Sequence, residues 1–576
     1  MTDAHSSDHY GNQWEPLLFS PPEREAMLAQ LEQSVFDSLV IGAGINGAVS
    51  ASALSGAGGR VVLLDRGDFA GGVSSSSSNL AWGGIKYLES GDLTLVRKLC
   101  LSRNELMDAY PSTVREIRFF TSIRRGFRLW SFVVWLGALL YWLMGNCRMR
   151  APRYLRAATI RAEAAIVAPE HIVGGLEYSD CYLYDNDSRF VFNFVRRAMD
   201  IGCVACNYCE VEDLAWHDDE RLWLVTLKDR VTKQTHRLKT RSVINATGPA
   251  TDALNRSVGI ETQHRHVLSK GIHLIVDRLS DHRKVLTFFA SDGRLFFVIP
   301  MGPKTCIGTT DTPVDTAQVG VTEGDRDFVL ANANELLQLA RPLTAEDVIA
   351  ERVGVRPLAL AGAQNERDWV QLSRKHEIEI DRDRCFLSIF GGKLTDCINV
   401  GEEVVAHVRE LGISLNGPQR QWYGEPSLAK RAAFMARAAK LQLDALTPET
   451  ASEPLSLRFW RRYGEYAHRI VDLIEADSRE AEHLLAEAEY TLAELRVTAE
   501  REMIVCFDDF MRRRSKVAQV IRARAIADDP GLNTLAGLFF GDQQASEFAD
   551  NYRKRYETPL VIRETNEGLS RDFAHQ

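Results

Sequence analysis

The sequence predicts an α/β protein whose N-terminal part is built around a βαβ unit and whose C-terminal part is helical. The chain has 576 residues, which suggests two or more domains. Two observations predict this arrangement. A strand, a glycine-rich turn, a helix and a second strand follow one another within 36–65, and from about Pro426 to Ile526 the composition shifts to Ala, Glu, Arg and Leu with helical periodicity.

From these features we expect four segments. They are an N-terminal arm at 1–34, an α/β region that contains the βαβ unit at 35–425, a helical domain at 426–526 and a tail at 527–576. In the arm, Ser20 and the two prolines after it predict a short amphipathic helix that ends near Glu32. The last residues, like many chain termini, are expected to have little regular structure.

The βαβ unit carries the sequence GAGING directly after its first strand. Gly42 permits a tight turn, Gly44 lets the backbone approach a pyrophosphate, and Gly47 lets the helix pack closely on the sheet. The helix N-terminus would present N–H groups to the phosphates. Asp65 ends the second strand about 20 residues further on, where a carboxylate can bind a ribose. This pattern predicts a Rossmann-like dinucleotide site; a glycine turn in another kind of βαβ unit is the alternative.

A polar loop follows, with a serine run at 74–78 and a glycine pair beside Trp82. A serine run is often a flexible linker. Here it lies where a flavin-binding domain needs a close-fitting polar loop, and the glycine pair indicates packing against a flat group. Further along, two apolar strands end in small-residue turns at 246–248 and 391–392.

The composition limits the classes of partner. A net charge of −9 gives no bulk attraction to nucleic acid. The 10 cysteines and the lack of a signal peptide indicate reduced thiols and a cytosolic location.

Cys203, Cys206 and Cys209 have the spacing of a metal or iron–sulfur site. No fourth cysteine follows nearby, and in a single strand successive thiols would lie on opposite faces. We therefore favour ordinary strand cysteines and predict no metal site.

The longest uncharged run lies at 129–147, with arginines on both flanks. Its length is marginal for a transmembrane helix. A single span would place the βαβ unit on the opposite side of the membrane from the strands that complete its sheet. Its tryptophans and flanking arginines instead favour a helix or hairpin in the membrane interface. A buried core helix is the alternative.

Motifs spread along the chain point to one family. They are IGAGINGA (41–48), SSSSSNLAWGGIKYLE (74–89), GLEYSDC (175–181), NATGP (245–249), SKGIHLIV (269–276), IGTTD (307–311), GVRPL (354–358), SIFGGKLT (388–395) and CFDDFMRRRSK (506–516). Through them the chain resembles the FAD-dependent glycerol-3-phosphate dehydrogenases, membrane-associated respiratory enzymes, over roughly residues 36 to 520. The resemblance implies a Rossmann-like FAD-binding domain, a mostly antiparallel substrate sheet that covers the flavin, and a C-terminal helical domain.

The resemblance also implies site residues. His273 corresponds to the family's active-site histidine, which would take the hydroxyl proton during hydride transfer to flavin N5. Arg356 and Lys393 would complete the catalytic group. Substrate binding is expected from Lys86, Tyr87, Arg356, Arg374 and Lys393, because a phosphate dianion favours Arg and Lys together. FAD binding is expected at Gly42, Gly44, Asn46, Gly47, Asp65, Ser75, Ser77, Ser78, Trp82, Gly83, Gly84, Ala246, Thr247, Gly248, Gly391, Gly392, Lys393, Leu394 and Thr395.

The chain departs from the family in the loop nearest the substrate. Trp82 stands where the family has histidine, Lys86 where it has arginine, and Asn79 where it tends to have lysine. Lys86 keeps the charge but loses the planar fork of arginine. These changes bear on the substrate more than on the cofactor.

We therefore expect oxidation of sn-glycerol 3-phosphate, or a related phosphorylated alcohol, to dihydroxyacetone phosphate. The enzyme would lie on the cytosolic face of a membrane through 129–147 and pass electrons to a membrane quinone. One alternative is a soluble oxidase that uses oxygen on a related anionic alcohol. Another is a flavin-binding, membrane-associated paralogue that has lost turnover. A homodimer stays open.

Overall fold

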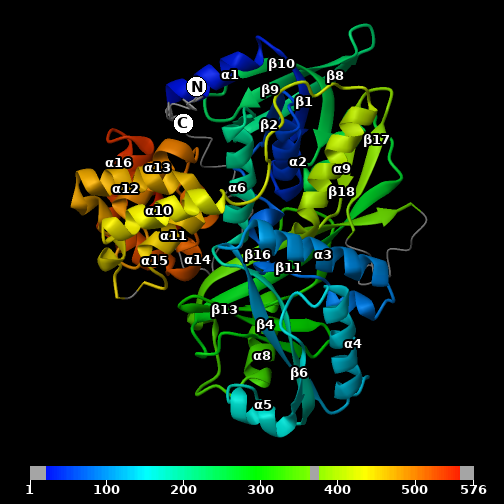
Figure 1. Ribbon diagram of the computed structural model, residues 1–576, viewed down its shortest axis with the longest axis vertical. Coiled ribbons are helices and arrows are strands. Elements are labelled where there is room, and N and C mark those ends of the chain that lie inside the picture. The colour runs from blue at the N-terminus through cyan, green and yellow to red at the C-terminus, as the bar shows by residue number, and fades with distance from the viewer. Residues whose placement is uncertain (1–20, 363–374, 450, 558–576) are drawn as a thin grey trace, which may run out of the picture.

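The computed structural model describes residues 21–362, 375–449 and 451–557. Figure 1 shows an α/β domain above, a second domain with a large sheet below, and a helical domain packed against one side. The chain passes between the two sheets several times, because strands of the first sheet come from both ends of the region 35–390. The second domain is therefore interleaved with the first.

The first sheet has eight strands and a parallel centre formed by β18, β10, β1, β2 and β7, in that spatial order. Its strands are β1 (Val35–Ile41), β2 (Val61–Leu64), β7 (Val204–Cys206), β8 (Cys209–His217), β9 (Leu222–Asp229), β10 (Thr235–Asn245), β17 (Glu377–Asp381) and β18 (Phe386–Phe390). The central strands are buried and apolar, as expected for a sheet covered on both faces. Helices α2 (Ile45–Gly56), α6 (Asp187–Asp200) and α9 (Cys397–Glu410) pack on one another against it.

The second sheet has ten strands and is mostly antiparallel, which confirms the expected second layer. It contains β3 (Leu80–Ala81), β4 (Val114–Arg124), β5 (Arg153–Arg156), β6 (Ile172–Leu183), β11 (His264–Asp277), β12 (Val285–Phe289), β13 (Leu295–Met301), β14 (Lys304–Gly308), β15 (Thr312–Val314) and β16 (Val348–Ala361). Because side chains alternate along a strand, β11 divides its residues between two faces. Ile272 and Leu274 lie in a core with α8 (Glu323–Leu336), whereas Ile275 packs with the core that includes Trp82.

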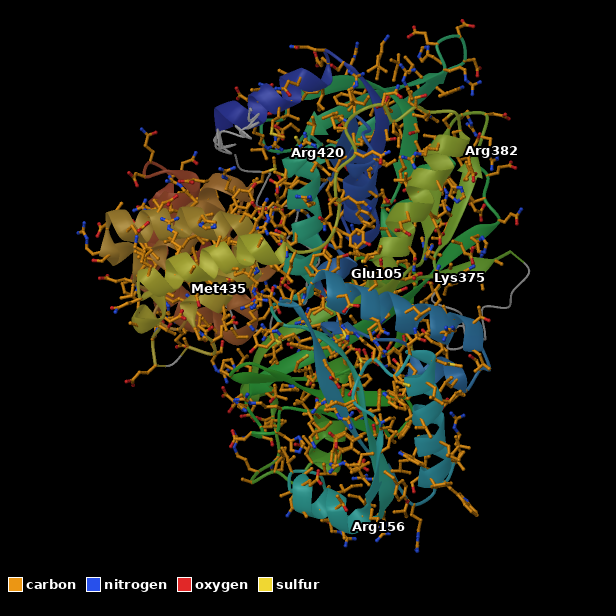
Figure 2. The ribbon with its side chains drawn as sticks, in the orientation of Figure 1. Glu105, Arg156, Lys375, Arg382, Arg420 and Met435 are labelled. Atoms are coloured by element: carbon orange, nitrogen blue, oxygen red, sulfur yellow. The ribbon has the colours of Figure 1, made fainter. Side chains whose placement is uncertain are left out.

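Three more helices flank the second sheet: α3 (Leu93–Ala109), α4 (Ser131–Met144) and α5 (Ala157–Glu163). Arg156, labelled at the foot of the molecule in Figure 2, marks the end of this domain farthest from the first sheet. The described chain resumes at Lys375, which the same figure places near the level of α3, between the two sheets. The arm forms α1 (Pro21–Leu31), which confirms the predicted N-terminal helix.

The helical domain extends well past the predicted end at residue 526. Its helices are α10 (Leu428–Lys440), α11 (Leu455–Tyr463), α12 (Ala467–Ala476), α13 (Leu492–Arg501), α14 (Val517–Val520), α15 (Ala523–Asp528), α16 (Gly531–Phe540) and α17 (Ala545–Glu557). The predicted end of the domain at 526 was therefore wrong. Of the last 25 or so residues, which were expected to have little regular structure, those up to Glu557 belong to α17. Leu532, Leu535, Ala549 and Tyr552 are buried in one core with α15, and this packing orders both last helices.

Buried ion pairs join the helical domain to the first domain. Arg514 donates from Nη1 and Nη2 to the two carboxylate oxygens of Asp68, each at 2.8 Å, and Arg513 Nε donates to the same carboxylate at 2.5 Å. Arg189 on α6 pairs with Glu502 at 2.5 Å. Apart from Arg513, which is partly exposed, these side chains are nearly inaccessible to solvent, so they fix how the helical domain docks.

Candidate active site

The glycine turn after β1 has the geometry that a dinucleotide site needs. Gly42 has φ +95°, and a Cβ there would lie 2.6 Å from the carbonyl oxygen of Ala246. A Cβ on Gly47 would lie 1.7 Å from the carbonyl oxygen of Gly42. Neither position therefore tolerates a side chain, and each glycine has the role predicted from the sequence.

Asp65 closes this turn from the end of β2. Its carboxylate accepts hydrogen bonds from the N–H of Ala43 at 2.7 Å and of Gly67 at 2.8 Å. These bonds hold the carboxylate beside the glycine turn, where a ribose hydroxyl would donate to it. The predicted turn at 246–248 begins where β10 ends, next to Gly42, so the two small-residue turns lie together.

The serine loop covers the start of α2. Ser74 accepts a hydrogen bond from the N–H of Ile45 at 2.9 Å, and the N–H of Ser77 donates to Asp187 at 2.6 Å. Ser75 and Ser78 are half-buried in the same loop. The run is therefore built into the fold and is not a linker, as expected.

The turn after β18 meets the glycine turn and the tryptophan loop. Asn46 donates from Nδ2 to the carbonyl of Gly391 at 3.0 Å, and Thr395 donates to the carbonyl of Trp82 at 3.1 Å. The ammonium of Lys393 lies 4.0 Å from the centre of the Tyr87 ring and 5.6 Å from that of Trp82.

The structure thus brings together predicted cofactor and substrate residues from three distant segments. The half-buried Leu394 packs against the core of the first domain. Gly83 donates its N–H to Asp180 at 3.0 Å, and Gly84 is left-handed with φ +79°. Lys86, by contrast, is exposed, so the structure does not place it among the buried groups of the site.

The remaining predicted residues lie on one face of β11 and β16. His273 pairs with Arg352, Gly271 with Gly354, and both strands present these residues toward the serine loop. Arg356 continues this face: a Cβ on Gly271 would lie 2.2 Å from its Nη2. The lack of side chains at the two glycines makes room on this face for the guanidinium of Arg356 over Gly271 and for Ser76 of the serine loop over Gly354.

Arg356 is held in place by polar groups that follow β14. Its Nη1 lies 3.2 Å from the carboxylate of Asp311, and its Nη2 donates to Thr309 Oγ1 at 3.1 Å. The side chain is about one-fifth exposed, so it has room to meet an anion. An arginine braced in this way presents a planar fork suited to a phosphate or carboxylate.

His273 is buried, and neither ring nitrogen has a hydrogen-bond partner among the described residues. Burial, followed by the charges of Arg352 and Arg356, lowers the pKa of this histidine to about 3. The imidazole is therefore neutral at physiological pH and can accept a proton.

These features fit an FAD. The glycine turn and Asp65 provide the pyrophosphate and ribose positions, and Asn46 Oδ1 is buried without a partner among the described residues, beside Gly392. When bound, FAD supplies a hydride acceptor. Residues 391–395 then lead into α9, whose N-terminus favours negative charge.

The predicted substrate residue Arg374 lies outside the described residues, so its prediction stays untested.

The predicted cysteine strand is divided into β7 and β8 by a turn at Asn207 and Tyr208, so it is not one strand. Cys203 packs in the core beside α2, while Cys206 and Cys209 lie together in the core on the other side of the sheet. In the part of the chain that the structure describes, no group of three or more ligating side chains could hold a metal ion.

Sequence reasoning missed Arg352 and Asp187. Arg352 is 5% exposed and donates from Nη2 to both carboxylate oxygens of Asp187, at 3.1 and 3.0 Å. Only the pairing of β11 with β16 places this arginine beside His273. The sequence shows only an arginine two positions before the GVRPL motif; its burial is known from the structure.

The geometry agrees with comparisons to known proteins. The family model for FAD dependent oxidoreductases matches residues 37–385. The aerobic glycerol-3-phosphate dehydrogenase of Bacillus subtilis (strain 168) is 29% identical over 94% of this chain and 98% of its own length. That of Staphylococcus aureus (strain MRSA252) is 26% identical over 87% and 90%.

A solved structure has the same fold over nearly the whole chain. The glycerol-3-phosphate dehydrogenase from Bacillus halodurans, complexed with FAD, superposes with a TM-score of 0.69 at 26% identity and covers 93% of this chain and 98% of its own. The resemblance stated from the motifs is confirmed. The chain belongs to the FAD-dependent oxidoreductase family, and FAD is its cofactor.

Proposed function

We propose that this enzyme oxidises sn-glycerol 3-phosphate, or a closely related phosphorylated alcohol, at its secondary hydroxyl. The observation that carries the proposal is a neutral, buried His273 on the same glycine-lined face as Arg356. A base and an anion-binding fork so placed suit an alcohol that also carries a phosphate. The names of the relatives support this substrate class.

Each side chain has one task in this proposal. Arg356, together with Lys393 beside Tyr87, binds the phosphate. His273 takes the proton of the hydroxyl as hydride leaves the adjacent carbon, so the alcohol becomes a ketone. When substrate is bound, its phosphate dianion offsets the positive charge of Arg356. Because that charge lowers the basicity of His273, the offset raises it.

Replacing Gly271 with alanine is expected to raise KM for glycerol 3-phosphate about tenfold or more, because the new methyl group displaces the Arg356 fork. FAD content should stay normal, since the glycine turn is untouched. Steady-state kinetics of purified protein measure both. Gly320→Ala is the matched control, because a Cβ there meets nothing within 4 Å among the described residues. An unchanged KM for glycerol 3-phosphate in Gly271→Ala would contradict the proposed role of Arg356 in binding the phosphate.

We further propose that α4 rests on a membrane surface and that the electrons pass to a membrane quinone. The helix is apolar on all sides, and its outer face leaves Phe132, Leu136 and Leu143 about half exposed, beside Trp130 at 83%. Such a patch is unusual on a soluble surface. This exposure also argues against the alternative of a buried core helix. Among the described residues, no helix combines the length and hydropathy needed to cross a bilayer.

The arginines that flank α4 contribute less than the sequence suggested. Arg128 pairs with Glu89, Arg148 with Asp108, and Arg150 with Glu116. The apolar face, and not the basic flanks, therefore carries the membrane proposal.

Changing Phe132, Leu136 and Leu143 together to serine is expected to weaken binding to phospholipid vesicles at least about tenfold, because burial of each apolar side chain favours docking. Vesicle co-sedimentation of the purified holoenzyme measures this. Leu428→Ser is the control, since that leucine is 77% exposed on α10 of the helical domain. Equal vesicle binding by all three proteins, with rapid oxygen consumption, would favour the soluble oxidase instead.

A further inference from the structure

Arg352 forms an ion pair at the junction of three elements. From β16 its Nη2 donates to Asp187 at the start of α6, and the same nitrogen donates to the carbonyl of Ser75 at 3.1 Å. The N–H of Ser77 donates to the same carboxylate. The pair therefore ties the serine loop, which covers the start of α2, to the strand that lies beside His273.

The strand register places Arg352 directly opposite His273. In an antiparallel pair, directly opposite residues project from the same face, close together. Arg356 projects from that face two pairs further along. Arg352 differs from Arg356 in its surroundings: its side chain is almost fully buried and already bound to a carboxylate, whereas Arg356 is partly exposed. Arg352 is thus suited to act on the histidine and not on the substrate.

The other charged and titratable groups around His273 are few. From β16 they are Arg352 and Arg356; Asp187 on α6 and Asp311 after β14 each lie against one of these arginines. Burial is the main reason that the pKa of the Cys306 thiol on β14 is raised to about 11, so this thiol is neutral. The two guanidinium groups therefore dominate the charge near the ring.

We propose that Arg352 is a positioning residue for His273: from β16 it anchors the serine loop and holds a fixed positive charge directly opposite the imidazole. The inference rests on the proposed function, in which His273 is the base. Its consequence is selectivity by charge. A phosphorylated alcohol bound at Arg356 brings negative charge that partly offsets the two guanidinium groups beside the base, whereas a neutral alcohol of the same shape leaves their effect in place.

The test compares Arg352→Gln with Arg352→Lys. Loss of the charge in Arg352→Gln is expected to raise the titration midpoint of His273 by about one to two pH units. Arg352→Lys keeps a cation and should leave the midpoint nearly unchanged. The midpoint is read in two ways on the FAD-loaded enzyme: from the acid limb of the pH profile of kcat/KM, and from the NMR shift of ¹³C-labelled histidine, with the His273 signal identified by its loss in His273→Gln.

Arg326→Gln is the matched control. Arg326 pairs with Glu351, the neighbour of Arg352 on β16, but this pair lies on the opposite face of the strand. The control removes an arginine from a comparable ion pair and should not move the midpoint. The inference would be overturned if the titration midpoint of His273 did not change in Arg352→Gln, or if it changed equally in Arg326→Gln.

Asp187→Asn is a second variant that tests the inference if Arg352→Gln does not fold. Asp187→Asn keeps the arginine but removes the negative charge that partly offsets it, so the His273 midpoint should not rise and should fall if it moves. A rise in Asp187→Asn would contradict the inference. The NMR titration needs no turnover, so it separates two failures: if His273 is not the base, the pH profile loses its meaning while the ring titration still reports the effect of Arg352.

Discussion

Replacing His273 with glutamine is expected to lower kcat about 10²–10⁴-fold, because the variant loses the group that takes the hydroxyl proton. KM should change little, since Arg356 and Lys393 still bind the phosphate. FAD content should also stay normal, because neither ring nitrogen bonds to any described part of the cofactor loops. Stopped-flow reduction of the bound flavin by substrate measures the loss directly.

The control for this variant is His282→Gln. His282 is half-buried in the same domain, and its Nε2 lies 2.9 Å from the carbonyl oxygen of Glu163, away from the glycine-lined face. It should reduce its flavin at the wild-type rate. If His273→Gln does so as well, the proton goes to another group and the assigned role of His273 is wrong.

Replacing Arg514 with methionine is expected to destabilise the protein by about 3–5 kcal/mol, because Asp68 keeps a buried charge without its bidentate partner. Burial raises the pKa of Asp68, but Arg514 and Arg513 outweigh it and hold that pKa below its ordinary value. The pair therefore stabilises the fold above the ordinary carboxylate pKa, and the stabilisation is lost as the pH falls through the lowered one.

Thermal melts near neutral pH and in acid measure both effects. The variant should melt at a lower temperature at neutral pH, and the gap from wild type should narrow as the pH falls. Asp68→Asn with Arg514→Met should recover part of the loss, since it removes both charges. Arg524→Met, which breaks an exposed pair with Asp528, is the control and should cost no more than about 1 kcal/mol. A neutral-pH melt of Arg514→Met equal to that of the control would contradict this account.

The local parts of the site could be predicted from the sequence. Gly42, Gly47 and Asp65 lie within one βαβ unit, and the constraints on them come from neighbours in the chain or from the next strand. The meeting of Lys393 with Tyr87 is different. Their segments are about 300 residues apart, and residue spacing alone does not place them together; the family resemblance did.

What could not be predicted depends on register and on packing. Arg352 lies opposite His273 only because β16 pairs with β11 in this register, and no local sequence pattern specifies that register. The last helices were missed for another reason. Leu532, Leu535 and Ala536 have helical spacing, but this short run follows a break at Pro530 and Gly531 and lies beyond the predicted domain end at 526. The exposure of the outer face of α4 likewise follows from what covers the helix, not from its composition.

In the proposed reaction, a bound FAD is reduced by a phosphorylated secondary alcohol in this site. The most direct measurement is the absorption spectrum of the detergent-purified protein, recorded without oxygen before and after adding sn-glycerol 3-phosphate. We expect the oxidised flavin band to disappear, while glycerol at the same concentration leaves it in place. A flavin band that persists with glycerol 3-phosphate, yet disappears on chemical reduction with dithionite, would contradict the assigned substrate.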